Sequence, residues 1–355
     1  VETLIDSGVE YTFGVPGGGA LFLYDALCRQ SGRITSVLAR QEGAAACMAD
    51  AYGRLTGKPA AVIAQGAWMG SNAAFGILEA FAAGSPMIVI TDASDYGGFS
   101  QYGPWQNGTG DYGGFDLVSI LRSMSKYVTC ANTPGELVHG IRLAARHAVS
   151  GKPGPACVVA RMNLFGMAVD IDTLSPKLLP QKGSPDNFKP SLADDEALAI
   201  ARALLDAKDP VCVAGIGVHI SKAHEELCRL AELLGMPVAT SYMGKSALAE
   251  THPLALGTMG AIGQKAANRK IQEADVLLVV GSALSPENTK MLSPEFIDPE
   301  RQTIIHLDIE ARNIGWTYRA AMGAVCDAKK GLAKIAAAVA SGKKRVDLAE
   351  RAESC

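Results

Sequence analysis

Three short segments in the first half of the chain carry residue types that could bind or activate a small molecule. Residues 13–19, Phe-Gly-Val-Pro-Gly-Gly-Gly, are rich in glycine, which lets a backbone turn tightly and approach a ligand closely. Residues 40–46 offer the carboxyl group of Glu42, and residues 65–72 offer amides and an indole ring. A carboxyl group buried beside a base or a heterocycle is a recurrent means of proton transfer in enzymes.

Each segment also has an ordinary structural interpretation. The glycines are equally typical of a tight strand-to-helix turn without a ligand. A glutamate at the start of a helix complements the helix dipole, and from spacing alone this is the more common role of Glu42. The small residues that follow, Gly43 to Ala46, permit close packing and therefore burial of the carboxyl group. Trp68 and Met69 in such a loop pack as often as they bind.

Predicted strands place the three segments at one edge of a sheet. Open α/β sheets bind ligands beyond the carboxyl ends of their parallel strands. The apolar runs are continuous rather than alternating, which indicates strands covered by helices on both faces. The predicted strands of the first half are Tyr11–Val15, Ile34–Ala39, Ala60–Ala64, Met87–Thr91 and Ala156–Ala160, and a capping box at Thr133–Glu136 starts a helix.

The second half repeats this α/β alternation. A stretch rich in Pro, Lys, Ser and Asp over residues 170–190 predicts a linker. A helix over Asp194–Ala207 follows, then strands at Val211–Ala214, Val238–Thr240, Val276–Val280 and Thr303–Asp308, and a last helix over Ala328–Ala340. The predicted fold class is α/β, with two doubly wound parallel-sheet domains over residues 1–169 and 191–345.

In their order and spacing, the segments of the first half resemble the pyrimidine-binding domain of one thiamine-diphosphate-dependent superfamily. Its members include acetolactate synthase, benzoylformate decarboxylase and oxalyl-CoA decarboxylase. The resemblance continues through Gly84–Thr91, Gln106, Ser125-Lys126 and Ser150–Pro155. The chain departs from the family at two places: Ala67-Trp68-Met69 replaces the usual Gly-Pro-Gly, and Gln41 replaces the usual histidine before the glutamate.

The resemblance implies a carboligase or decarboxylase that acts on a 2-oxo acid or a 2-hydroxyacyl substrate. Glu42 would be its catalytic residue, since the family glutamate bonds N1′ of the aminopyrimidine and thereby activates the cofactor. The residues expected around the aminopyrimidine by the same matching are Pro16, Gln65, Trp68, Asn72 and Gln106.

The second half resembles the Rossmann-like middle domain of the same family, which holds FAD in acetolactate synthases and an adenine nucleotide in oxalyl-CoA decarboxylases. Asp308, at a strand end, could accept from ribose hydroxyls or cap a helix. The residues after Gly281 lack the Arg and Asp of the FAD-binding members, which weakens the FAD prediction. The candidate nucleotide-binding residues are Gly215, Gly217, Met243, Gly244, Gly281 and Asp308.

The family binds Mg²⁺ and the cofactor diphosphate through a Gly-Asp-Gly motif on a third domain. This sequence has none; Gly110-Asp111-Tyr112 comes nearest. We therefore expect no metal ligands here, with a C-terminal diphosphate-binding domain absent from the sequence or supplied by a separate subunit. By resemblance, the protein is a homo-oligomer, a dimer or a tetramer. The alternative is a non-catalytic nucleotide-binding or regulatory module of the same fold.

Composition excludes other classes of function. The net charge is −3 and no long Lys/Arg run occurs, so we expect no nucleic-acid partner. No apolar run approaches the ~20 residues that span a bilayer, so we expect no membrane partner either. The eight cysteines are scattered without metal-binding spacing, which indicates reduced thiols and a cytoplasmic location. A dehydrogenase is disfavoured because no strand is followed by a full G-x-G-x-x-G.

Overall fold

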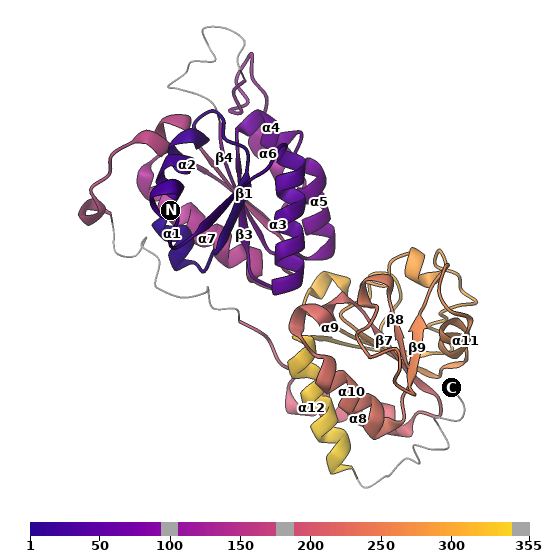
Figure 1. Ribbon diagram of the computed structural model, residues 1–355. Helices are drawn as coiled ribbons and strands as arrows, with labels where there is room; N and C mark the ends of the chain where they lie inside the picture. Colours follow the sequence, from indigo (N-terminus) through magenta and orange to yellow (C-terminus); the bar gives the residue numbers. More distant parts are fainter. Residues whose placement is uncertain (94–105, 175–187, 343–355) are drawn as a thin grey trace. The chain divides into compact units, whose positions relative to one another are not determined.

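A computed structural model describes residues 1–93, 106–174 and 188–342, and the chain divides into two compact units, Val1–Phe188 and Lys189–Cys355 (Figure 1). Each unit is a six-stranded, fully parallel sheet flanked by helices, so the predicted α/β class is confirmed. Most of the predicted linker, residues 175–187, and the predicted end of the second domain at residue 345 lie outside the described residues.

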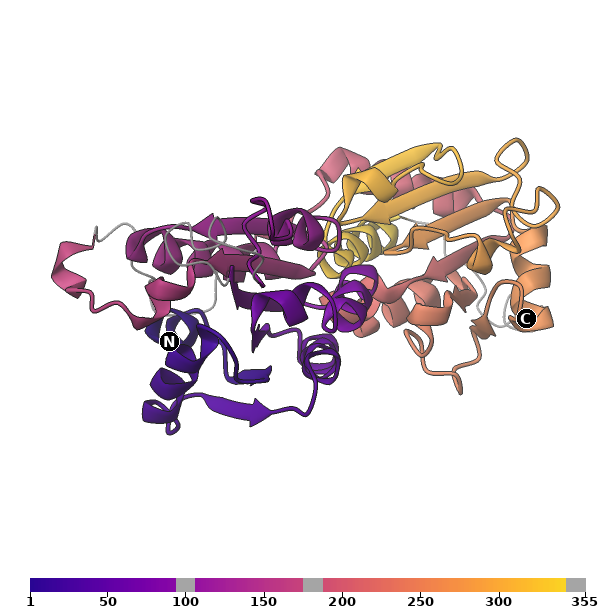
Figure 2. The same ribbon diagram turned by 90° about the horizontal axis from the view of Figure 1, so that it is seen from above.

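Unit 1 is a sheet of order β2-β1-β3-β4-β6-β5, with β2 at its outer edge (Figure 2). Its strands are β1 (Tyr11–Gly14), β2 (Thr35–Leu38), β3 (Ala60–Ala64), β4 (Met87–Asp92), β5 (Tyr127–Ala131) and β6 (Pro155–Ala160). Its helices are α1 (Glu2–Asp6), α2 (Ala20–Arg29), α3 (Glu42–Thr56), α4 (Gly66–Gly70), α5 (Ala74–Ala83), α6 (Leu117–Arg122) and α7 (Pro134–Val149), with 3-10 turns at Met162–Gly166 and Ile171–Thr173.

Helices cover both faces of the unit 1 sheet, which explains its continuous apolar strands. In β3, Ala60, Val62 and Ala64 pack into the cluster under α3 and α5, whereas Ala61 and Ile63 pack into the cluster under α1, α2 and α7. Figure 1 shows the two sets of helices on opposite sides of the sheet. A strand buried on both faces has no polar alternation, as the sequence predicted.

The chain of unit 1 reverses its direction of winding between β1 and β3. From β1 it moves outward to β2, and it then returns to place β3 on the other side of β1. The loops that leave β1 and β3 therefore lie where the strand order reverses, which is the usual ligand position in a doubly wound sheet.

Unit 2 has the sheet order β12-β11-β10-β7-β8-β9. Its strands are β7 (Pro210–Ala214), β8 (Val238–Thr240), β9 (Ala255–Thr258), β10 (Val276–Val280), β11 (Thr303–Asp308) and β12 (Met322–Val325). Its helices are α8 (Asp194–Asp206), α9 (Ile216–Ser221), α10 (His224–Leu234), α11 (Lys265–Glu273) and α12 (Ala328–Ser341), with 3-10 turns at Tyr242–Gly244, Glu287–Thr289 and Ala311–Asn313.

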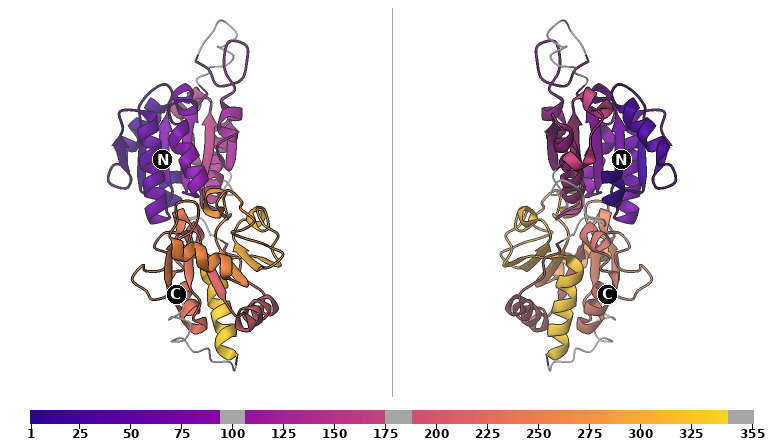
Figure 3. Two further views of the ribbon diagram at one scale, coloured as in Figure 1. Left: turned by 90° about the vertical axis from the view of Figure 1, so that its right-hand side faces the viewer. Right: turned by 90° about the vertical axis from the view of Figure 1, so that its left-hand side faces the viewer.

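The sheet of unit 2 is also covered on both faces. In β10, Val276, Leu278 and Val280 pack towards α8, α10 and α12, the last being the long yellow helix of Figure 3. Leu277 and Val279 pack towards α11 and the segment around Phe296. The winding reverses between β7 and β10, so the loops after these two strands are neighbours.

Three strands escaped the sequence analysis: β5, β9 and β12. All three are edge strands, whose outer sides are only partly covered. In residues 1–93, 106–174 and 188–342, every helix is too short or too polar to span a bilayer. The seven cysteines of these ranges are all free thiols.

Candidate functional site

The glycine segment after β1 packs directly against the loop after β3. A Cβ on Gly17 would lie 3.3 Å from Oε1 of Gln65, and one on Gly18 would lie 3.1 Å from its Cγ. Gly18 also has a φ of +52°, a conformation that favours glycine. The structure thus brings two of the three predicted segments together where the strand order reverses, and Pro16 is exposed beside them.

Glu42 is the first residue of α3, and its side chain is buried although it carries a carboxyl group. Only 7% of the residue is exposed. The Nδ2 group of Asn72 donates a hydrogen bond to its Oε2 over 3.0 Å. Gly43 makes room for this approach, because a Cβ there would lie 2.8 Å from the Asn72 carbonyl oxygen. Glu42 also lies in the first turn of α3, where a carboxylate complements the helix dipole, so the buried position and the dipole position coincide in one residue.

A second pair of predicted residues meets across the loops after β3 and β4. Nε2 of Gln65 donates to Oε1 of Gln106 over 3.0 Å. Trp68 lies on α4 with 42% of its surface exposed, whereas the neighbouring Met69 is fully buried. Trp68 is therefore available at the surface, while Met69 belongs to the core.

Tyr24 is a residue near Glu42 that the sequence analysis missed. Its hydroxyl donates to the carbonyl of Ile63 over 2.8 Å. Burial, with the nearby charge of Glu42 as the second cause, raises the pKa of Tyr24. Gly14 is necessary for this contact, because a Cβ there would lie 1.9 Å from the Ile63 oxygen and 2.1 Å from the Tyr24 hydroxyl. No sequence pattern marks a tyrosine in the middle of α2 as a site residue.

Asp92 is the second missed residue. It is fully buried at the carboxyl end of β4, and its Oδ2 accepts the backbone N–H of Gly19 over 2.8 Å. The bond anchors the glycine segment to the sheet. An acidic residue that ends an otherwise apolar strand, Met87 to Thr91, was the signal that could have found it.

The carboxyl edge of unit 1 therefore combines a buried carboxyl group with amide donors and acceptors from several loops. Such a set suits a planar heterocycle with ring nitrogens and an exocyclic amine, because the carboxyl group can exchange a proton with a ring nitrogen while amides fix the ring. The residues present fit the aminopyrimidine half of thiamine diphosphate.

In unit 2, four candidate glycines meet where the winding reverses, but they pack against protein. A Cβ on Gly215 would lie 2.2 Å from the Gly281 oxygen, and one on Gly217 would lie 2.7 Å from the Gly281 Cα. A Cβ on Gly244 would lie 2.2 Å from the Ala214 oxygen. Close backbone packing accounts for these glycines, whereas Met243 beside them is exposed.

The carboxyl group of Asp308 already has protein partners. Its Oδ1 accepts the backbone N–H of Glu310 over 2.8 Å, and its side chain is hydrogen-bonded to Asn313. Burial raises the pKa of Asp308. The carboxyl group thus closes a turn at the end of β11. This turn leads directly into the 3-10 turn Ala311–Asn313, which Glu310 caps. These contacts offer no support for a ribose-binding role.

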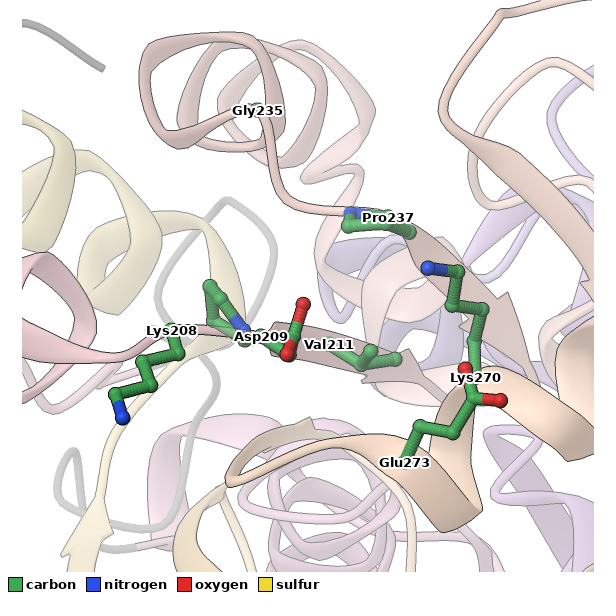
Figure 4. A pocket seen from close by; sticks show the side chains of 8 residues that line it. Lys208, Asp209, Val211, Gly235, Pro237, Lys270 and Glu273 are labelled. Atoms are coloured by element: carbon green, nitrogen blue, oxygen red, sulfur yellow. The ribbon is translucent and has the colours of Figure 1, made fainter. Parts of the chain in front are cut away.

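A pocket of about 230 Å³ occurs in unit 2, at the amino ends of its strands. Figure 4 shows Lys208 and Asp209 before β7 on one side of it and Lys270 and Glu273 of α11 on another. It lies at the edge of the sheet opposite to the carboxyl ends, so it is separate from the candidate nucleotide-binding residues.

The described residues offer no oxygen-rich cluster of three side chains that would suit Mg²⁺. Asp111, in the segment that comes nearest to the diphosphate motif, instead accepts the hydroxyl of Thr109 over 2.6 Å within a local turn.

Comparison with known proteins gives the family. Residues 1–111 match the N-terminal TPP binding domain of thiamine pyrophosphate enzymes, and residues 198–335 match their central domain. Thiamine pyrophosphate is the same compound as thiamine diphosphate. The two matches together cover well over half of the chain.

The relatives are acetolactate synthase subunits. The chain is 33% identical over 341 residues to a probable acetolactate synthase large subunit of Methanocaldococcus jannaschii. The aligned region covers 96% of this chain and 55% of that protein. It is 31% identical over 340 residues to the acetolactate synthase isozyme 3 large subunit of Escherichia coli. That aligned region covers 94% of this chain and 55% of the Escherichia coli protein. The chain thus spans about half the length of the relatives it matches. It belongs to the thiamine pyrophosphate enzyme family, of which it contains the N-terminal and central domains.

Proposed function

We propose that this chain forms part of a thiamine-diphosphate-dependent enzyme that makes or breaks the C–C bond beside the carbonyl of a 2-oxo acid or 2-hydroxyacyl substrate. The observation that carries the proposal is the buried carboxyl group of Glu42, bonded by Asn72, within residues that match a TPP binding domain. The acetolactate synthase relatives support carboligation in particular.

When bound, thiamine diphosphate supplies the nucleophilic carbon and the electron sink for the C–C step. Glu42 exchanges a proton with the pyrimidine ring. Because Asn72 bonds Oε2, we assign this exchange to Oε1. Gln65 and the turn at Pro16 orient the ring. Gln106 holds Gln65 by a hydrogen bond, and Asp92 holds the turn through the N–H of Gly19. Trp68 stands where the family usually has proline, and its larger side chain restricts the room for the substrate.

We propose that Mg²⁺ and the cofactor diphosphate are held outside these 355 residues, either by a continuation of the chain or by another subunit. The absence of Gly-Asp-Gly supports this assignment. We propose no nucleotide in unit 2, because its glycines and Asp308 are explained by packing and local hydrogen bonds. A cytoplasmic location stays a prediction.

We propose that the enzyme is a homo-oligomer and that a second copy packs on the outer face of α3 and α5. These two helices pack side by side and expose five large apolar side chains, namely Met48, Leu55, Phe75, Leu78 and Phe81. An exposed apolar face of this kind marks an interaction surface. Leu78→Lys should lower the mass measured by light scattering, whereas Phe22→Lys on α2 should leave it unchanged; equal masses for all three proteins would refute the assignment.

The enzymatic proposal is tested with the purified protein and any subunit that co-purifies with it. Thiamine diphosphate, Mg²⁺ and pyruvate should give release of CO₂, and Glu42→Gln should lower the rate by at least about 10²-fold. Glu273→Gln, which changes an exposed carboxylate on α11 of unit 2, serves as the control. Release of CO₂ at the wild-type rate by Glu42→Gln would refute the mechanism, and tight nucleotide binding without turnover would favour the regulatory module.

A further inference from the structure

Three side chains with good metal-ligand chemistry converge on the surface of unit 2, away from the carboxyl edge of its sheet. Cys228 and Glu232 lie one turn apart on α10, and His252 lies in the turn before β9. One potential ligand atom from each residue lies within 4.8 Å of the other two. Residues four apart on a helix face the same way, so the pair on α10 is presented by a single rigid element.

We propose that Cys228, Glu232 and His252 form a Zn²⁺ site that fastens α10 to the turn before β9. Zinc accepts sulfur, nitrogen and oxygen ligands in one tetrahedral site, which distinguishes it from Mg²⁺ and Ca²⁺. Three protein ligands leave the fourth position to water, an arrangement found in open zinc sites.

The backbone around the cluster is firmly held. Leu227, Leu230 and Ala231 of α10 are fully buried in the unit 2 core, which fixes the direction of the outward face that carries Cys228 and Glu232. Two backbone hydrogen bonds hold the turn that contains His252. The N–H of His252 donates to the carbonyl of Ala249 over 2.9 Å, and the N–H of Ala255 donates to the carbonyl of His252 over 2.9 Å.

Metal binding requires only a small contraction of the cluster. Ligand atoms of a tetrahedral zinc site lie about 3.5 Å apart when the metal–ligand distances are 2.0–2.3 Å. Nε2 of His252 already lies 3.4 Å from Oε1 of Glu232. The Glu232 side chain is more than half exposed and therefore free to change rotamer. Burial raises the pKa of the Cys228 thiol, and the nearby carboxylate of Glu232 is the second cause, which shows that the two side chains are close.

Without metal, Nε2 of His252 and Oε1 of Glu232 make a surface contact over 3.4 Å, and such contacts contribute little to stability. The N–H of Leu254 donates to Nδ1 of His252 over 3.2 Å, so the neutral ring carries its proton on Nε2. Zinc on Nε2 moves that proton to Nδ1 and breaks the bond from Leu254, and it also releases the thiol proton. Both costs lower the affinity of the site for Zn²⁺.

The test uses untagged protein stripped with EDTA. Calorimetry with Zn²⁺ should show one site per chain, and Co²⁺ in place of Zn²⁺ should give a thiolate-to-cobalt absorption band. Cys228→Ser should abolish the band, and Cys228→Ser and His252→Gln should each weaken Zn²⁺ binding by at least about tenfold, since even outer-shell changes cost 10–100-fold. Zn²⁺ should also raise the melting temperature, and EDTA should reverse the rise.

Two control variants separate this cluster from other ligands of the chain. Cys47→Ser removes a half-buried thiol of unit 1 and should change nothing. His224→Ala breaks the neighbouring pair in which Nδ1 of His219 and Nε2 of His224 lie 3.0 Å apart. Zinc binding that survives Cys228→Ser but disappears in His224→Ala would place the metal on that imidazole pair and overturn the proposal. So would the absence of binding or of the cobalt band.

Discussion

The buried amide of Gln302 gives a stability prediction that can be worked from the structure. Only 3% of this residue is exposed, and its side chain ends helix α11. Nε2 donates to the carbonyl of Ile271 over 2.6 Å and to that of Ala274 over 3.0 Å, while Oε1 accepts the N–H of Asp298 over 2.8 Å. Both atoms of the amide are therefore hydrogen-bonded: Nε2 holds two carbonyl groups at the end of α11, and Oε1 holds one backbone N–H.

Gln302→Met keeps the length of the side chain but removes these bonds. Ala274 keeps a partner in Arg301, which leaves the Ile271 carbonyl and the Asp298 N–H without one. A buried unpaired backbone group costs about 1–3 kcal/mol, so the free energy of unfolding of unit 2 should fall by about 3 kcal/mol. For a unit of this size, the melting temperature should drop by about 6–12 °C.

The neighbouring Gln272→Met is the matched control. Its Nε2 makes one bond at the surface, to the Glu295 carbonyl over 3.2 Å, and its loss should cost at most about 0.5 kcal/mol. Thermal and urea denaturation followed by circular dichroism would compare the two variants. Equal melting temperatures for Gln302→Met and Gln272→Met would refute the reasoning that the buried amide stabilises the end of α11.

Three further predictions concern the framework of the two units. Lys126 donates to the carbonyl of His147 in the last turn of α7 and to those of Ser150 and Lys152 just after it, so Lys126→Met should cost about 1–2 kcal/mol in urea denaturation. Lys58→Met, which breaks a surface ion pair, should cost less than about 1 kcal/mol, and the reverse order would contradict this reasoning. Gly14→Ala should destabilise unit 1 by about 2–3 kcal/mol, because its Cβ meets backbone, whereas Gly32→Ala has open space; equal melting points would argue against the close approach. Burial lowers the pKa of His306, so the unfolded state takes up a proton first as the pH falls below about 6.5, and unit 2 should lose stability as the pH falls from about 7 to about 5. His306→Gln should lose less over the same range, and an equal loss would show that His306 is not responsible.

Much of the fold could be predicted because its signals are local. The strands at Ala60–Ala64 and Val276–Val280 are buried on both faces, so their apolar runs are unbroken and the predicted bounds match the observed ones. The helix that begins after Thr133 was marked by its cap, and the Thr133 hydroxyl does accept the N–H of Glu136. Three of the four edge strands, β5, β9 and β12, were missed. β9 and β12 have only four residues each and contain a glycine, so they show no apolar run long enough to predict a strand.

The sequence predicted those site residues that come directly after a predicted strand, but not the residues that reach the site from elsewhere in the fold. The burial of Glu42 depends on Asn72, which is 30 residues away, and the sequence does not show that contact. Tyr24 and Asp92 were missed for the same reason, since one reaches the site from a helix and the other through the N–H of Gly19. The glycines of unit 2 were predicted as candidate nucleotide-binding residues, whereas their close backbone approaches favour packing.

The most direct test of the central claim is the rate at which the C2 proton of bound thiamine diphosphate exchanges with deuterium, followed by NMR. The protein is used together with Mg²⁺ and any subunit that co-purifies. If Glu42 exchanges a proton with the pyrimidine ring, Glu42→Gln should slow this exchange by about 10²–10⁴-fold while the cofactor stays bound, and Glu273→Gln should have the wild-type rate. An unchanged rate in Glu42→Gln, with the cofactor bound, would show that this carboxyl group does not activate the cofactor.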